Sequence, residues 1–142
     1  VTIVYGSIHG HTAKAAKIMQ KMLEDRGQKV EIFDLARDDM AEAIECAYRY
    51  DKLVIATVTY DAGVFPVVED FVYHLKLKNY QKRTVGIIQN GSWGAVAGKK
   101  VKESLETLKD IKIVDPMVTI RSALKEGNLT AMEALADALV AK

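Results

Sequence analysis

The order of β-rich and helical segments constrains the fold of this chain more than any other feature. Five short β-rich runs alternate with segments of helical apolar period, and the runs cover residues 1–5, 30–34, 52–57, 83–89 and 111–120. Strict alternation of this kind predicts an α/β fold with a parallel sheet. Because crossovers between parallel strands are right-handed, we expect a doubly wound sheet with helices on both faces.

The composition of the runs predicts their order in the sheet. Runs 1–5, 52–57 and 83–89 are nearly continuously apolar, as is typical of central strands that helices cover on both faces. Run 30–34 alternates only in part, and run 111–120 contains Pro116, which cannot donate a hydrogen bond to a neighbouring strand. Placing these two at the edges gives the strand order 2-1-3-4-5.

Apolar residues at helical spacing predict five helices between and after these runs. They are Ala16, Met19 and Leu23; Met40, Ile44 and Ala47; Val68, Phe71, Val72 and Leu75; Val101, Leu105 and Leu108; and Leu129, Met132, Ala136 and Leu139. Thr130 and Glu133 have the spacing of a capping box, which predicts the start of the last helix. One domain of 142 residues accounts for all of these elements.

Composition narrows the function classes. Twenty basic and nineteen acidic residues give a net charge of +1, which favours neither a nucleic-acid-binding module nor an acidic tail. No apolar run approaches a membrane span or a signal peptide, so we expect a soluble protein without a membrane partner. The single cysteine, Cys46, excludes an internal disulfide and suits the cytoplasm. The chain opens on a strand without Met, which suggests a domain cut from a longer chain.

Three segments follow the central strands, where doubly wound folds bind ligands. The first consists of Ser7, Ile8, His9, Gly10, His11 and Thr12 and leads directly into a helix. The N–H groups of a first helical turn, two hydroxyls and a glycine for close approach indicate an anion site, such as one for a terminal phosphate. The alternative is an ordinary helix start that Ser7 or Thr12 caps.

The second segment follows the run at 52–57. It consists of Thr57, Val58, Thr59, Tyr60, Asp61, Ala62, Gly63, Val64, Phe65 and Pro66. Ten residues are many for a connection from a strand to a helix, and such loops are usually functional. Pro66 suits the first position of a helix, and Gly63 allows a peptide group to turn toward a ligand. A surface loop without a function is the alternative.

The third segment follows the run at 83–89 and begins with Asn90, Gly91, Ser92, Trp93 and Gly94. Trp93 is the only tryptophan of the chain, and its small neighbours cannot build a core around it. We therefore expect it to offer a flat surface to a flat ligand. Packing against a neighbouring subunit is the alternative. Together the three segments predict a site for a flat, phosphorylated ring system.

The three segments resemble those of the flavodoxin-like superfamily, and the similarity extends over essentially the whole chain. The pattern Ser7-x-His9-Gly10-x-Thr12 is similar to the family's phosphate loop. The resemblance implies a flavodoxin-like five-stranded sheet with FMN as the cofactor, whose phosphate would lie on Ser7, Thr12 and the N–H groups between them. The two later segments would hold the isoalloxazine ring, with Trp93 on or beside it.

A narrower resemblance is to the carboxyl-terminal FMN domain of the A-type flavoproteins, or flavodiiron proteins. Residues 57–66 are similar to the family's Ser-Pro-Thr-Tyr-Asn-Ala-Gly-Ile-Phe-Pro, and 91–94 to its Gly-Ser-Tyr-Gly. Val58 and Asp61 depart from the family's proline and asparagine, which alters the rigidity of the loop and one polar contact to the flavin. The resemblance implies an electron-transfer domain of an oxidoreductase that reduces dioxygen or nitric oxide, without a complete catalytic site of its own.

The resemblance also implies partners. Electrons would come from a rubredoxin-like donor or from an NAD(P)H:flavin or rubredoxin reductase, and would pass to a diiron domain absent here, in a homodimer arranged head to tail. The balanced charge, with Lys99, Lys100 and Lys102 on one helix, favours a tethered domain, and a solvated face is the plainer interpretation of these lysines. We expect no metal ligand among His9, His11 and His74.

Three alternatives have different functions. A free-standing short-chain flavodoxin would carry electrons by diffusion. A response-regulator receiver shares the strand order, but it needs acidic residues where this chain has Gly6-Ser7 and Thr57-Val58. A flavin-free interaction module would use Trp93 and Tyr60 as a protein-binding patch.

Overall fold

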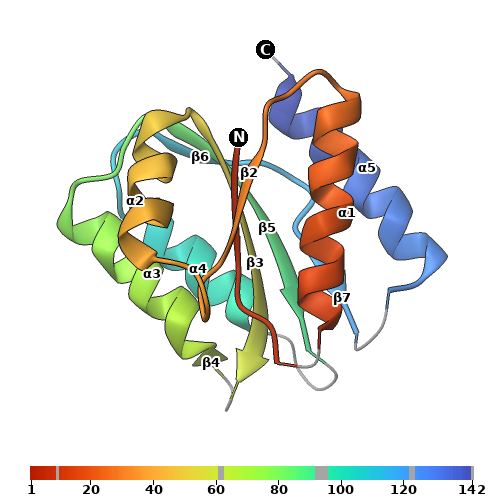
Figure 1. The fold of residues 1–142 in the computed structure, drawn as a ribbon, viewed down its shortest axis with the longest axis horizontal. Coiled ribbons are helices and arrows are strands. Elements are labelled where there is room, and N and C mark those ends of the chain that lie inside the picture. The colour runs from red at the N-terminus through yellow and green to blue at the C-terminus, as the bar shows by residue number, and fades with distance from the viewer. Residues whose placement is uncertain (9, 61–62, 92–95, 122–123, 142) are drawn as a thin grey trace.

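The computed structural model describes residues 1–8, 10–60, 63–91, 96–121 and 124–141, and in this part of the chain strands and helices alternate (Figure 1). The strands are β1 (Thr2–Tyr5), β2 (Glu31–Asp34), β3 (Lys52–Tyr60), β4 (Gly63–Val64), β5 (Arg83–Asn90), β6 (Ile111–Ile113) and β7 (Val118–Ile120). The helices are α1 (His11–Asp25), α2 (Met40–Arg49), α3 (Pro66–Leu77), α4 (Ala97–Glu106) and α5 (Glu126–Val140).

The sheet has the order β2-β1-β3-β5-β6, with β7 also paired to β5 and β4 paired to β3. All of these pairs are parallel except β3 with β4. The apolar runs of β1, β3 and β5 lie in the middle, where neighbouring strands satisfy their backbone groups on both sides. The predicted α/β class and the predicted order 2-1-3-4-5 are therefore confirmed.

The last predicted strand, 111–120, is divided in two. β6 pairs with the beginning of β5, at Arg83–Val85, and β7 pairs with its end, at Ile88–Asn90. The interruption contains Pro116, which follows a cis peptide bond and has no N–H to donate to β5. The run occupies the predicted edge of the sheet, but as two short strands rather than one.

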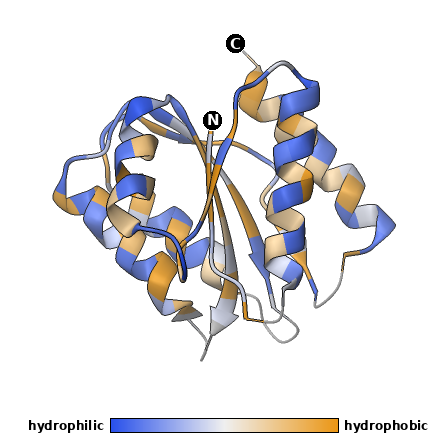
Figure 2. Ribbon diagram, in the orientation of Figure 1, coloured by the Kyte–Doolittle hydropathy of each residue, from blue (hydrophilic) through white to orange (hydrophobic). Residues whose placement is uncertain are grey.

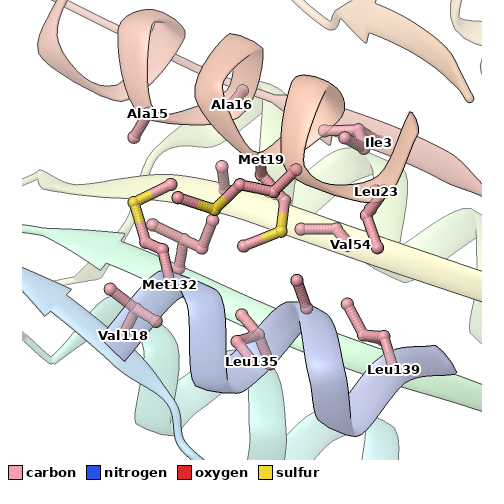
Figure 3. Packing of buried hydrophobic residues seen from close by; sticks show 14 of the residues in the cluster. Ile3, Ala15, Ala16, Met19, Leu23, Val54, Val118, Met132, Leu135 and Leu139 are labelled. Atoms are coloured by element: carbon pink, nitrogen blue, oxygen red, sulfur yellow. The ribbon is translucent and has the colours of Figure 1, made fainter. Parts of the chain in front are cut away.

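Helices cover both faces of the sheet, as predicted. Figure 1 shows α1 and α5 on one side and α2, α3 and α4 on the other. Figure 2 shows that apolar and polar residues alternate along these helices, and their buried residues are largely apolar. Consecutive strand residues point to opposite faces, so Ile3 belongs to the core under α1 and α5 while Val4 belongs to the other core. In the first core, Met19 of α1 packs near Met132 of α5 (Figure 3).

Two details of the predicted helices are wrong. α5 begins at Glu126, and its start is closed by Asn128, whose Oδ1 accepts the N–H of Lys125 at 3.0 Å. Thr130 and Glu133 therefore lie inside the helix and form no capping box at its start. Leu129 points away from the core and is 38% exposed.

Within the described residues, no helix has the length and apolar character needed to cross a lipid bilayer.

Candidate functional site

The carboxyl ends of β1, β3 and β5 meet at one edge of the sheet, at the bottom of Figure 1. Tyr5 is in register with Ala56, and Val58 is in register with Asn90. The three segments expected to bind a ligand follow these positions, so the fold brings their beginnings together. This edge is the candidate functional site.

Gly6 joins the first segment to the beginning of α3. Its N–H donates to the carbonyl of Ala56 at 3.1 Å, which continues the strand pairing beyond β1. A Cβ at Gly6 would lie 2.8 Å from Phe65 Cδ2 and 2.9 Å from Val68 Cγ2, closer than side chains pack. The absence of a side chain therefore allows the first segment to lie against the end of the second.

The start of α1 is open to an anion. Gly10 precedes the helix with a φ of +85°, and α1 has neither a side-chain cap nor an acidic residue in its first turn. The Ser7 hydroxyl accepts the N–H of Gly10 at 3.0 Å, outside the first turn, and Thr12 is buried within it. This bond does not give α1 the side-chain cap that the alternative interpretation required, and among the described residues no side chain caps the first-turn N–H groups at the positive end of the helix dipole.

Residues 57–66 do not form the ten-residue loop that the sequence suggested. Thr57 to Tyr60 continue β3, and Gly63–Val64 returns antiparallel to it as β4, with Thr59 opposite Val64. The β-branched residues of this stretch suit a strand, which explains why it pairs. α3 then begins at Pro66, as predicted.

Thr59 connects this hairpin to α4. Its Oγ1 accepts the N–H groups of Val96 at 3.1 Å and of Ala97 at 3.2 Å, which are the cap and the first residue of α4. A hydroxyl from another strand therefore performs the capping that a serine or threonine normally provides within its own segment. The second and third segments are linked by these two bonds.

Gln89 is a residue of this edge that the sequence analysis placed in a strand but not in the site. Its Oε1 accepts the N–H of Gly98 at 2.8 Å, and its Nε2 donates to Thr119 Oγ1 at 2.9 Å. It is 7% exposed, and Asn90 beside it is 5% exposed. The available signal was a pair of amide side chains at the end of an otherwise apolar central strand, because buried polar groups need partners.

The described part of the chain contains many of the predicted site residues at this edge. They are Ser7, Ile8, Gly10, His11, Thr12, Thr57, Val58, Thr59, Tyr60 (backbone), Gly63, Asn90 and Gly91. His9, Asp61, Ala62, Ser92, Trp93 and Gly94 lie outside the described residues.

The histidines of the described residues both lie in helices. His11 is the first residue of α1, and His74 lies in α3 with its Nδ1 2.8 Å from the carbonyl oxygen of Asp70. In the ranges that the structure describes, no group of three or more His, Cys, Asp and Glu residues could hold a metal ion.

Three grooves of the described surface lie between or along helices. One of about 500 Å³ lies between α3 and α4, and another of about 780 Å³ lies between α2 and α3. A third, of about 710 Å³, runs along α1 past Lys14 and Lys17 and reaches the candidate site at Gly10. Because ligands of doubly wound folds bind beyond the strand ends, the candidate site rests on those ends and not on these grooves.

The sequence matches the family model for flavodoxin over residues 3–134. The chain belongs to the flavodoxin family. No curated protein matches the sequence at a significant level.

Several solved structures share the fold of this chain at low sequence identity. Rubredoxin oxygen:oxidoreductase from Desulfovibrio gigas has a TM-score of 0.88 and 16% identity, covering 97% of this chain and 34% of that one. Flavodoxin 1 from Bacillus cereus has a TM-score of 0.85 and 12% identity, covering 98% and 95%. The flavodiiron protein from Giardia intestinalis has a TM-score of 0.83 and 16% identity, covering 96% and 34%. The chain thus spans about a third of the length of the first of these proteins.

The cofactor of the flavodoxin family is FMN. The described residues fit its phosphate, because α1 offers an uncapped N-terminus without a carboxylate in its first turn. Ser7 and Thr12 add hydroxyls at the same place, and Gly10 lets the backbone approach closely. These donors are neutral, and the N–H groups of a helix start bind a phosphate through hydrogen bonds and the positive end of the helix dipole.

Proposed function

We propose that this chain transfers electrons with FMN bound at the carboxyl edge of β1, β3 and β5, as the FMN domain of a flavodiiron oxidoreductase that reduces dioxygen or nitric oxide. The observation that supports this most is segment 57–66. Its sequence resembles the flavodiiron motif, and its hairpin is joined to α4 through Thr59 and to the first segment through Phe65 and Gly6.

In this proposal the first segment binds the phosphate. The Ser7 oxygen already accepts the N–H of Gly10, so its O–H hydrogen can donate to a phosphate oxygen. Thr12 and the first-turn N–H groups of α1 donate from the same side, and the helix dipole stabilises the negative charge. The first-segment residues assigned to FMN are Ser7, Ile8, His9, Gly10, His11 and Thr12.

The other two segments hold the ring system. The bonds from Thr59 to α4 fix the hairpin relative to the third segment, so a flat ring between them is oriented and shielded from water. Trp93 offers its flat side chain to the ring. When bound, FMN supplies the redox chemistry. The residues assigned to the ring are Thr57, Val58, Thr59, Tyr60, Asp61, Ala62, Gly63, Asn90, Gly91, Ser92, Trp93 and Gly94.

The partners in this proposal are other proteins or domains. A rubredoxin-like donor or a reductase supplies electrons, and a diiron domain of the partner copy in a head-to-tail homodimer receives them. A free-standing flavodoxin is the second candidate, and the similarity to the Bacillus cereus flavodoxin over 95% of that chain favours it. The compartment proposed for both is the cytoplasm, which suits the single free thiol of Cys46.

Titration of the purified chain with FMN, followed by quenching of flavin fluorescence, tests the site. Ser7→Ala and Thr12→Val should each weaken binding about 10- to 100-fold, because a hydrogen bond to a charged group contributes about 1.5–3 kcal/mol. Thr2→Val is the matched control, since it removes another buried threonine hydroxyl at the opposite end of β1. Loss of binding in the control alone, or no binding of micromolar FMN by the unmodified chain, would reject the site.

The size of the natural protein distinguishes the two candidates. An antibody against this chain should detect, in cells that express the gene, a polypeptide about three times as long, since the chain covers 34% of the Desulfovibrio gigas protein. Detection of a polypeptide no longer than a single flavodoxin would establish the free carrier instead.

A further inference from the structure

Helix α3 buries one face and exposes two large apolar side chains on the other. The buried face consists of Val68, Phe71, Val72 and Leu75. On the solvent side, Tyr73 is 57% exposed and Leu77 is 60% exposed. They are two of the four large apolar side chains that are exposed in the described residues. One exposed apolar residue needs no explanation, but two on adjacent turns of one helix favour a contact surface.

Charged residues flank Tyr73 and Leu77. Two acidic residues lie one turn before Tyr73 and a lysine lies about one turn after it, and at spacings of three and four residues they share one side of the helix. We call this surface the α3 stripe, which consists of Glu69, Asp70, Tyr73, Lys76 and Leu77. Among the described residues, neither Glu69 nor Lys76 has an ion-pair partner. The stripe is thus apolar in its middle, acidic at its beginning and basic near its end.

The stripe is accessible and has a groove beside it. α3 packs against α2 on one side and α4 on the other, so its outer side is the middle of this face of the molecule (Figure 1). The groove of about 500 Å³ between α3 and α4 is lined by Glu69, Tyr73 and Lys76 from the stripe. Two buried valines, Val72 and Val101, also line it. An apolar side chain from a second molecule therefore finds an apolar lining there.

The order of charges makes the stripe complementary to itself. If two α3 helices pack antiparallel and cross at Tyr73, each residue three positions before Tyr73 lies opposite the residue three positions after it in the other copy. Asp70 then lies opposite the partner's Lys76, and the two-fold axis repeats this pair. Glu69, at the edge of the groove, lies opposite the partner's Leu77, and the two Tyr73 rings meet at the axis.

Other partners fit the stripe less well. A parallel pair of α3 helices would place like charges opposite each other, which is unfavourable. A partner of uniform charge would be repelled by one end of the stripe. The charges alone do not require a partner, because an acidic start and a basic end stabilise any helix. Together with the exposed Tyr73 and Leu77, however, they match a second copy of this chain in both polarity and apolar character.

We propose that the α3 stripe is the contact surface of a two-fold symmetric dimer of this chain. The inference does not rest on the proposed function, because Tyr73 and Leu77 lie apart from the candidate site. It also differs from the head-to-tail arrangement proposed above, in which this chain contacts a diiron domain. Because one helix pair buries less than the about 1,200 Å² of a standard interface, we expect a weak dimer that forms at about 0.1–1 mM.

Sedimentation velocity of the purified chain at increasing concentration tests the dimer, and charge reversal tests its surface. Asp70→Lys and Lys76→Asp should each raise the dissociation constant about tenfold, because each places like charges opposite one another at two symmetric positions. The double variant Asp70→Lys/Lys76→Asp restores opposite charges and should restore dimerisation. All of these side chains are exposed, so the variants should fold, and circular dichroism checks that they do.

Two control variants are matched to these changes. Glu45→Lys changes the net charge as Asp70→Lys does, but on the exposed side of α2, and should leave the dimer unchanged. Leu77→Ser should weaken the dimer, because it removes the apolar side chain that meets the groove. Leu129→Ser removes an exposed leucine from α5 and should have no effect.

Each outcome decides the inference. A chain that stays monomeric at about 1 mM overturns it, and the stripe then faces solvent or a different protein. A dimer that Asp70→Lys and Glu45→Lys weaken equally overturns it as well, as does a double variant that dimerises no better than the single ones. Because sedimentation is measured without FMN, a failure of FMN binding contradicts the proposed function alone.

Discussion

Cys46 has an environment that makes its thiol unreactive. The side chain is 3% exposed, its Sγ donates to Glu31 Oε2 at 2.9 Å, and the Thr2 hydroxyl donates to its carbonyl oxygen at 3.1 Å. Burial first, and then the hydrogen bond with the Glu31 carboxylate, raises the pKa of the thiol from 9.0 to about 11. Because the thiolate is the reactive form, we expect a structural cysteine rather than a redox group.

The raised pKa of Cys46 predicts a loss of stability in alkali. The unfolded chain releases the thiol proton above pH 9.0, while the folded chain keeps it until about pH 11. Stability from this group is therefore complete below pH 9 and declines as the pH rises toward 11, by about 2–3 kcal/mol in total. Urea unfolding at a series of pH values measures the decline.

Cys46→Ala is the control for this decline. The variant is less stable at every pH because a small cavity replaces the sulfur, but its stability should fall less between pH 9 and pH 10.5. If the free energy of unfolding fell equally with pH in the two proteins, the Cys46 thiol would not be the cause of the decline.

Among the elements, α1 and α5 are joined by one arginine. Arg26, just beyond α1, places its Nε 2.8 Å from Asp137 Oδ1 and one terminal nitrogen 2.6 Å from Glu133 Oε2, both on α5. Another nitrogen donates to the carbonyl of Met22 at 2.9 Å. The guanidinium thus links the end of α1 to α5, the two helices that cover the core around Met19.

Replacing this arginine should weaken the helix pair modestly. Arg26→Gln is expected to lower the free energy of unfolding by up to about 1 kcal/mol, because its carboxylate partners are exposed and ion pairs of this kind are screened by water. The loss should shrink in high salt, since screening already weakens the pair in the unmodified chain. Urea unfolding at low and high salt measures both effects.

Arg49→Gln provides the comparison, since the ion pair of Arg49 with Glu45 lies within α2. A loss for Arg26→Gln no larger than for Arg49→Gln, or one independent of salt, would contradict the assigned role.

The elements that sequence predicts well are those with a strong apolar period. The stripe of α1 and the apolar runs of β1, β3 and β5 specify both burial and strand order, because burial of these side chains dominates the energetics. The β3–β4 hairpin was missed because β4 consists of two residues only, Gly63 and Val64, which are too few to show an apolar period. Leu129 was wrongly predicted to face the core, because exposing a single leucine on a helix costs little free energy.

At the scale of the whole molecule, the site is assembled from segments that are distant in sequence. The edge was predictable because parallel strands end together, so Ser7, Thr57 and Asn90 had to lie near one another. The hydrogen bonds that hold this edge together were not predictable. The bonds from Thr59 to α4 and from Gln89 to Gly98 each join residues of different elements. Sequence periodicity carries no information about such tertiary hydrogen bonds.

The central claim is that the open start of α1 binds the phosphate of FMN. Calorimetric titration of the chain with FMN and with riboflavin, which has the same ring system without the phosphate, tests it most directly. The account predicts that FMN binds at least about 100-fold more tightly, because the helix start, Ser7 and Thr12 act on the phosphate alone. Equal affinities for FMN and riboflavin would contradict it.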